Sequence, residues 1–268
     1  MATYLWGGAT VISGSNIQAD PDAFCALVAE QRITTIDLVP GVLNGILQHV
    51  AQVPERAAAL KTLQVVVVGG EELTPSVADL VARVGLQARF FNLYGPTEAS
   101  IGSIAHEVDT GGTGKVPIGR PIVNTSALIL DDHFQPVPRG VRGELVLGGV
   151  CVGLGYLGDR RRTQSRFIDL AEHGRVYRTG DRARIRSDGT LEFLGRRDDQ
   201  LSINGVRVET GEIVRALDTI DGVARGGVIA VAVAGDIRRR LLDHLQARKP
   251  DLAQTVALKS ILDRVEQN

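Results

Sequence analysis

Cysteine and aromatic residues are scarce in this chain of 268 residues. There are 2 cysteines, Cys25 and Cys151, and aromatic residues make up 4% of the sequence. The cysteines lie too far apart in sequence to suggest a metal site, and a chain so poor in cysteine is typical of a reducing compartment. We therefore expect a cytoplasmic protein with two buried, unreactive thiols.

Long apolar runs and a strong net charge are also missing. No apolar run approaches the length of a membrane span, and the N-terminus lacks the basic start and apolar block of a secretion signal. The formal net charge is -1, so there is no broad basic field for nucleic acid or an anionic membrane. We expect neither as a partner. The 44% of hydrophobic residues suffices for a substantial core.

The first part of the chain alternates short apolar runs with stretches of helical spacing. The runs ATVI, ITTIDLV, LQVVVVG and ARFFNLY predict strands that begin near Ala9, Ile33, Leu63 and Ala88. The stretches DPDAFCALVAEQ, PGVLNGILQHV and TPSVADLVARVG predict helices, the last with Thr74 as its cap and Gly85 at its end. For residues 1–110 this alternation predicts an α/β subdomain with a helix-covered, largely parallel sheet, in which ligands bind at the carboxyl ends of strands.

The pattern changes after about Gly111. Residues 111–197 contain short strands separated by Pro, Gly and Asp-Gly turns, which predicts a small antiparallel β-barrel. From about Asp198 the sequence predicts a helix, an apolar strand and a charged helical tail. Residues 198–268 are therefore expected to form a small α+β C-terminal subdomain, atypical or truncated.

The stretch RFFNLYGPTEAS ends a predicted strand on a rigid turn. Gly95 permits a tight turn and close approach of the backbone to a ligand, and Pro96 fixes that turn. Thr97 can donate to an anionic oxygen, and Glu98 can hold a magnesium ion together with phosphate oxygens and water. The combination suits a nucleotide phosphate, although a strand-ending loop with a solvated glutamate fits these residues equally well.

Two later stretches carry polar residues beside turns. Asp181 in YRTGD could accept hydrogen bonds from a ribose, and Arg196 in GRRDDQ could pair with phosphate or ribose oxygens. Taken singly, Asp181 fits a turn cap better, and GRRDDQ fits a charged linker between domains.

Together these stretches resemble the adenylate-forming enzymes. FNLYGPTEAS, GELVLGGVCVGLGYL, YRTGD and GRRDDQLSINGVRVETGEI occur in the order and spacing of that family, and the likeness runs from the start of the chain to about Gly235. The sequence most resembles the amino-acid adenylation domains of nonribosomal peptide synthetases. The resemblance implies that a carboxylate and ATP give an acyl-adenylate and pyrophosphate, with transfer to the phosphopantetheine thiol of a peptidyl carrier protein.

The resemblance also implies ATP or AMP and Mg²⁺ as cofactors, and it implies roles for individual residues. Thr97 would touch the α-phosphate and Glu98 would place the magnesium ion, as the catalytic pair. Tyr94 would stack on adenine, Asp181 would bind the ribose hydroxyls, and Asp198 would be the hinge of the small domain. The other residues expected around the nucleotide are Gly69, Gly70, Glu71, Gly95 and Arg196.

The amino-acid pocket that the resemblance implies contains one charged residue, Asp37. The others are apolar or small, namely Val67, Gly69, Leu93, Ile101 and Gly102. An aspartate in such a pocket is costly to desolvate unless the substrate brings the opposite charge, so a basic amino acid such as arginine or lysine is predicted. The alternative is that Asp37 caps the turn at Pro40 and points to solvent.

The sequence departs from the family pattern at both ends. We find no Gly-, Ser- and Thr-rich phosphate loop upstream of YGPTE, and neither Lys249 nor Lys259 sits in the family's C-terminal lysine motif. We therefore expect the distal portion of an adenylation domain, a poor catalyst alone, with the missing N-terminal half as a partner. The alternatives are a degenerate module that binds a nucleotide or a partner without catalysis, and an acyl- or aryl-CoA ligase relative, which YGPTEAS and GVRVETGEI disfavour.

Overall fold

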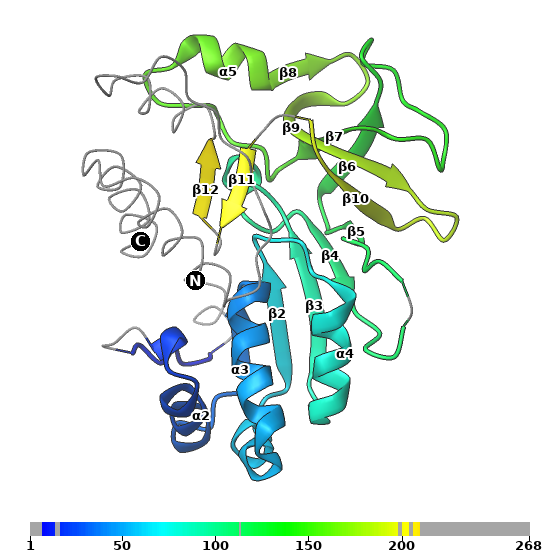
Figure 1. Ribbon diagram of the computed structural model, residues 1–268. Helices are drawn as coiled ribbons and strands as arrows, with labels where there is room; N and C mark the ends of the chain where they lie inside the picture. Colours follow the sequence, from blue (N-terminus) through cyan, green and yellow to red (C-terminus); the bar gives the residue numbers. More distant parts are fainter. Residues whose placement is uncertain (1–6, 14–16, 113, 198–199, 204–205, 210–268) are drawn as a thin grey trace, which may run out of the picture. The chain divides into compact units, whose positions relative to one another are not determined.

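Figure 1 shows the computed structural model, which describes residues 7–13, 17–112, 114–197, 200–203 and 206–209. The chain divides into two compact units, Met1–Asp198 and Asp199–Asn268, and each is described by itself. The predicted hinge residue Asp198 lies outside the described residues, as do the helix, strand and tail predicted beyond Glu209.

The first sheet of the first unit has five strands in the order β1-β2-β3-β4-β5. These are β1 (Thr35–Leu38), β2 (Val65–Gly69), β3 (Arg89–Tyr94), β4 (Ile104–Glu107) and β5 (Arg120–Pro121). The pairs β1–β2 and β2–β3 are parallel, whereas β3–β4 and β4–β5 are antiparallel. The sheet is therefore mixed, and its parallel part consists of three strands that the sequence predicts.

Three helices pack on this sheet: α2 (Pro21–Glu30), α3 (Pro40–Gln52) and α4 (Pro75–Val84). Each begins with a proline, whose fixed backbone angle suits the first helical position. The helix α4 ends at Gly85, which has φ 70°, as predicted. Thr74 is its N-cap residue, as predicted, although the Thr74 hydroxyl contacts Ser76 Oγ at 2.8 Å and makes no hydrogen bond to the helix backbone.

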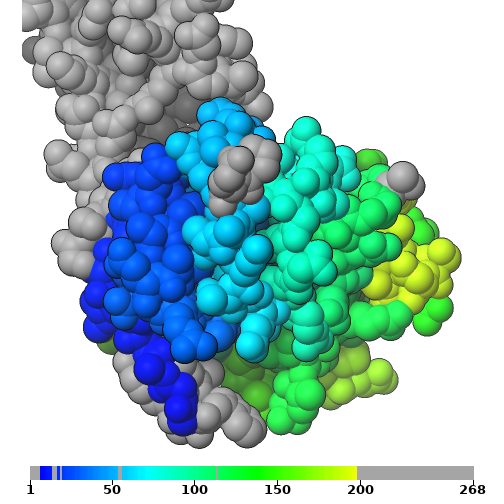
Figure 2. Space-filling model, turned by 90° about the horizontal axis from the view of Figure 1, so that it is seen from below, coloured from blue at the N-terminus to red at the C-terminus, as the bar shows by residue number. Residues whose placement is uncertain are grey.

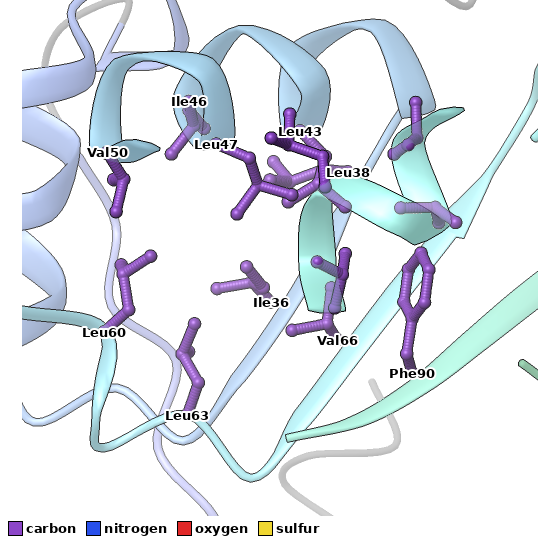
Figure 3. Close-up of a cluster of buried hydrophobic side chains, with 14 of the residues drawn as sticks. Ile36, Leu38, Leu43, Ile46, Leu47, Val50, Leu60, Leu63, Val66 and Phe90 are labelled. Atoms are coloured by element: carbon purple, nitrogen blue, oxygen red, sulfur yellow. The ribbon is translucent and has the colours of Figure 1, made fainter. Parts of the chain in front are cut away.

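Alternate residues of the strands face the helices and form the first core. Ile36, Val66 and Phe90 pack with Leu43 and Leu47 of α3 (Figure 3). From below, the surfaces of α2, α3 and α4 follow one another in chain order (Figure 2). Because side chains alternate along a strand, the residues between them lie on the opposite face of the sheet.

The segment near Ala9 forms no strand, contrary to the prediction. Val11 is 41% exposed and Ile12 is 85% exposed. Within the described residues no strand pairs with this segment. A short apolar run is stable as a strand only when a neighbour satisfies its backbone and a core covers its side chains.

The second sheet is antiparallel, with the order β10-β9-β7-β6 and with β8 paired to β9. Its strands are β6 (Thr125–Leu130), β7 (Gly143–Gly149), β8 (Phe167–Leu170), β9 (Gly174–Ile185) and β10 (Leu191–Arg196). The helix α5 (Arg160–Arg166) precedes β8. The antiparallel arrangement agrees with the sequence, while closure into a barrel remains a prediction.

The two sheets share a second core. Ala99, in the turn after β3, and Ile104 of β4 belong to the same buried cluster as Leu145 and Leu147 of β7. Cys151 is part of this cluster and Cys25 belongs to the first core, so both cysteines are buried as expected. The stretch after β3 therefore lies at the junction of the two sheets.

The remaining elements are short. Three 3₁₀-helices occur in the described part of the first unit, η1 (Ile17–Ala19), η2 (Pro54–Leu60) and η3 (Thr97–Ala99). In the second unit, β11 (Gln200–Ile203) and β12 (Val206–Glu209) form an antiparallel pair. None of the helices described is both long enough and apolar enough to cross a membrane.

Candidate functional site

The turn after β3 depends on glycine and on close backbone contacts. A Cβ atom on Gly95 would lie 2.3 Å from the carbonyl oxygen of Ile101, so a larger residue would force the backbone apart. Ser103 N donates to the Tyr94 carbonyl at 2.9 Å and closes the loop. The short helix η3 between these contacts carries Thr97 and Glu98 at the carboxyl end of β3.

Three of the predicted nucleotide-binding residues meet at one carboxylate, and we call Tyr94, Asp181 and Arg196 the Asp181 cluster. The Tyr94 hydroxyl donates to Asp181 Oδ2, and Arg196 Nη1 donates to Asp181 Oδ1 at 2.6 Å. Asp181 N donates to Thr179 Oγ1 at 2.9 Å. Strands β3, β9 and β10 each contribute one member, so both sheets build this site.

The Asp181 cluster is nearly buried. The side chains of Arg196 and Asp181 are 19% and 10% exposed, and opposite charges in such a place depend on each other. Burial, and then the negative charge of Asp181, raise the pKa of the Tyr94 phenol well above its ordinary value. The phenol therefore stays neutral and acts as a hydrogen-bond donor at physiological pH.

A loop after β7 holds Glu98 through two contacts. Gly153 N donates to the Glu98 carbonyl at 2.9 Å, and the Tyr156 hydroxyl donates to Glu98 Oε1 at 2.5 Å. Burial, and then the bond to Glu98, raise the pKa of Tyr156 above its ordinary value, so this phenol is also a donor. Sequence reasoning assigned no role to Tyr156, although GLGYL belongs to the stretches that carry the resemblance.

The last residue of β2 and Glu71, two residues after it, make close contacts with β3 and α3. A Cβ atom on Gly69 would lie 2.7 Å from the Leu93 carbonyl oxygen, and Gly70 has φ 83°, a conformation that favours glycine. Glu71 Oε2 accepts a hydrogen bond from Gly41 N at 3.3 Å, in the first turn of α3. Glu71 thus satisfies a helix N-terminus, and its place in an adenine pocket stays a prediction.

Four of the predicted amino-acid-binding residues share the sheet face opposite the first core. Asp37 pairs with Val67 across β1 and β2, and Gly69 pairs with Leu93 across β2 and β3. A Cβ atom on Gly102 would lie 3.2 Å from Leu93 Cδ2, which puts that residue beside the same face. Ile101, the sixth predicted residue, is exposed at the surface of the adjacent turn.

Asp37 is exposed as a residue, although partial burial of its carboxyl raises its pKa above the usual value. Among the described residues none donates a hydrogen bond to this carboxylate. The alternative was that Asp37 caps the turn at Pro40 and points to solvent. The capping hydrogen bond is not observed, whereas the exposure of Asp37 to solvent is.

Comparison with known proteins identifies the family. Residues 1–157, more than half of the chain, match the family described as AMP-binding enzyme. The chain belongs to the AMP-binding enzyme family. The expectation of an enzyme of this kind is confirmed by that match.

Individual relatives of this AMP-binding enzyme point to nonribosomal peptide synthetases. The chain is 35% identical over 232 residues to tyrocidine synthase 3 of Brevibacillus parabrevis, covering 84% of this chain and 4% of that protein. It is 39% identical over 252 residues to phosphinothricin tripeptide synthetase PhsB of Streptomyces viridochromogenes, covering 92% of this chain and 20% of that protein. The chain thus spans a small part of these relatives.

Solved structures agree with the sequence relatives. Holo-PA1221, an NRPS protein containing adenylation and PCP domains, is similar with a TM-score of 0.70 and 29% identity, covering 78% of this chain and 36% of that one. The AMPPNP-bound form of the synthetase FmoA3 is similar with a TM-score of 0.61 and 34% identity, covering 66% of this chain and 19% of that one. The predicted resemblance to adenylation domains of nonribosomal peptide synthetases is therefore confirmed.

Proposed function

We propose that this chain is part of a domain that activates an amino acid with ATP, giving an aminoacyl-adenylate and pyrophosphate. The convergence of Tyr94, Asp181 and Arg196 carries this proposal, because residues far apart in sequence build one polar, nearly buried site. The site lies beside the turn with Thr97 and Glu98. That turn follows the carboxyl end of β3, where ligands of such sheets bind.

Adenylate formation depends mainly on the positioning of the reactants and on stabilisation of charge, and it needs no nucleophile from the protein. Asp181 would accept hydrogen bonds from the ribose hydroxyls, and Arg196 would hold that carboxylate in place. Tyr94 would pack on adenine, and Thr97 would donate to the α-phosphate. The hydrogen bonds of Tyr94 and Arg196 to Asp181 support these roles.

Glu98 fits a magnesium ion that arrives with a nucleotide. Magnesium in proteins is commonly held by one or two carboxylates, substrate phosphates and water. Within the described residues no group of three acidic, histidine or cysteine side chains could form a cage. Glu98 would supply the protein carboxylate, and a bound magnesium ion would supply positive charge to offset that of the phosphates.

We further propose the finer organisation that the resemblance implies. Residues 111–197 would close into a small barrel, and residues 198–268 would form a mobile subdomain with Asp198 as its hinge. The second half-reaction would pass the aminoacyl group to the phosphopantetheine thiol of a peptidyl carrier protein. The similarity to a protein that contains adenylation and PCP domains supports this partner.

Pyrophosphate exchange tests the proposal. The chain should give little amino-acid-dependent exchange alone, and clear exchange when an adenylation-domain N-terminal half is supplied. In that completed domain, Asp181→Asn should lower exchange by about 100-fold, since losing a positioned polar contact costs roughly 3 kcal/mol of barrier.

The control is Asp79→Asn, an exposed residue of α4, which should exchange like the unmodified domain. Nucleotide binding without exchange in the completed domain would indicate the degenerate module instead. If the Asp181→Asn variant keeps normal pyrophosphate exchange, the Asp181 cluster is not needed for the reaction, and the proposal loses its main support.

We also propose that the amino acid is basic, because Asp37 lies on the same sheet face as Val67 and Leu93. Partial desolvation already raises the pKa of its carboxyl, and an arginine or lysine side chain would offset that desolvation. In the completed domain, arginine and lysine should be exchanged better than leucine, phenylalanine and glutamate. Asp37→Ala should abolish this ranking, and an unchanged ranking would exclude Asp37 as the specificity residue.

A further inference from the structure

The loop that carries Tyr156 is fixed to the helix that follows it. Gly155 has φ 138°, and a Cβ atom there would lie 2.5 Å from Thr163 Cγ2, so glycine is required for the close approach. Tyr156 N donates to Thr163 Oγ1 at 2.9 Å. Asp159 Oδ1 accepts a hydrogen bond from Arg162 N at 2.8 Å and caps α5. The backbone at Tyr156 is therefore held by α5.

The ring of Tyr156 is held as well. The Arg162 guanidinium lies over one face, 4.6 Å from the ring centroid. Phe167 makes an edge contact with a centroid separation of 5.6 Å. The Tyr177 hydroxyl lies 3.4 Å from the Tyr156 hydroxyl. A ring with contacts on several sides can present its hydroxyl at a defined point.

The Tyr156 hydroxyl donates a hydrogen bond to Glu98. The 2.5 Å bond to Oε1 and the backbone bond from Gly153 to the Glu98 carbonyl together clamp the residue from one loop. A hydrogen bond to an ionised carboxylate is stronger than one between neutral groups. One oxygen of Glu98 is thus oriented by Tyr156, which also sets the direction of the other oxygen.

We infer that Tyr156 is a positioning residue that orients Glu98 for a metal–nucleotide ligand, an inference that rests on the proposed function. Tyr156 does not touch the ligand in this role. It keeps the Glu98 carboxylate in one orientation before the metal–nucleotide ligand binds. Binding of that ligand then carries no entropic cost for ordering the carboxylate. Outer hydrogen-bond partners of metal-binding side chains typically change metal affinity by about 10- to 100-fold when removed.

Tyr156→Phe removes the hydroxyl and keeps the ring. The experiment titrates the completed domain with Mn²⁺ in the presence of AMPPNP and follows free Mn²⁺ by electron paramagnetic resonance. We expect Tyr156→Phe to weaken Mn²⁺ binding by about 10- to 100-fold. The melting temperature should change by no more than a few degrees, because the packing of the ring is kept.

Val176→Ala is the stability control, because Val176 is fully buried in the cluster of Leu130, Val146 and Val176, which does not include Tyr156. It should lower the melting temperature and keep Mn²⁺ affinity within about twofold of the unmodified domain. Equal Mn²⁺ affinity in Tyr156→Phe and the unmodified domain would overturn the inference, and so would an equal loss of affinity in Val176→Ala.

Glu98→Gln separates this inference from the proposed function. If it leaves Mn²⁺ binding intact, Glu98 is not a metal ligand, and both its proposed role and the inference are wrong. If it weakens binding and Tyr156→Phe does not, the proposed function stands and only the inference is wrong. Absence of Mn²⁺–AMPPNP binding in the unmodified completed domain would overturn both.

Discussion

Ile101 has an unusual backbone for a β-branched residue. Its φ is 68°, and Ser100 before it has φ 58°, so two successive residues without glycine's freedom adopt left-handed conformations. Such a conformation costs an L-residue roughly 1–2 kcal/mol. It persists because the backbone of Ile101 closes the turn against Gly95.

Replacing Ile101 should therefore stabilise the protein. Asparagine tolerates the left-handed region, and Ile101 is an exposed side chain with little packing to lose. Ile101→Asn should raise the free energy of unfolding by about 1 kcal/mol in a urea titration. Val123→Asn, at another highly exposed residue, should change it by less than about 0.5 kcal/mol. An equal or lower stability of Ile101→Asn would show that the left-handed backbone carries no strain.

At the scale of elements, the end of β10 is anchored by two neighbouring arginines. Arg196 donates to Asp181, whereas Arg197 Nη1 donates to Asp132 Oδ1 at 2.6 Å. Arg197 N also donates to the Gly180 carbonyl at 2.8 Å. The chain is thus tied to β9 by backbone and side chain immediately before the first unit ends.

Asp132→Ala should speed tryptic cleavage after Arg197. Cleavage needs the Arg197 side chain to enter the protease, and the bond to Asp132 opposes this. The pair is exposed, so it adds little to global stability, and the melting temperature should not change measurably. Mass spectrometry of timed digests gives the rate at this bond.

Glu107→Ala is the control for this digest, because it breaks an exposed pair with Arg89 in the first sheet. Cleavage after Arg197 should proceed in this variant as in the unmodified chain. The anchor would be refuted if Asp132→Ala and Glu107→Ala gave the same rate at that bond.

The elements with the clearest local signals were those predicted correctly. Pro40 and Pro75 mark helix starts, and the run of valines from Val65 can pair on both sides and pack on both faces. The segment near Ala9 has the same apolar character, but pairing depends on a neighbour that local sequence cannot reveal. Thr74 likewise stands at its cap position and bonds elsewhere, because a hydroxyl has several partners within reach.

The candidate site could not be predicted from local sequence patterns alone. Tyr94 and Asp181 are 87 residues apart in sequence, and only the likeness to a family suggested that they act together. The contacts of Tyr156 and Gly153 with Glu98 were not predicted, since the sequence does not show which carboxylate a tyrosine will contact. Contacts that are long-range in sequence are set by the packing of whole elements.

At the scale of the first unit, the two sheets are joined where the predicted chemistry lies. The buried Ala99 packs in the core that includes Leu145 and Leu147 of the second sheet. The Asp181 cluster adds a polar connection between β3 and the pair β9–β10. Separation of the sheets would thus disrupt a buried hydrophobic cluster and a buried ion pair together.

Under the proposed function, the position of Arg196 would couple nucleotide binding to the chain that follows. Arg196 bonds Asp181, and the boundary between the units comes only two residues later. Free-energy coupling is reciprocal. Under the proposed function, any rearrangement after residue 197 that draws Arg196 away from Asp181 changes nucleotide affinity by some factor. Nucleotide binding then changes the equilibrium of that rearrangement by the same factor.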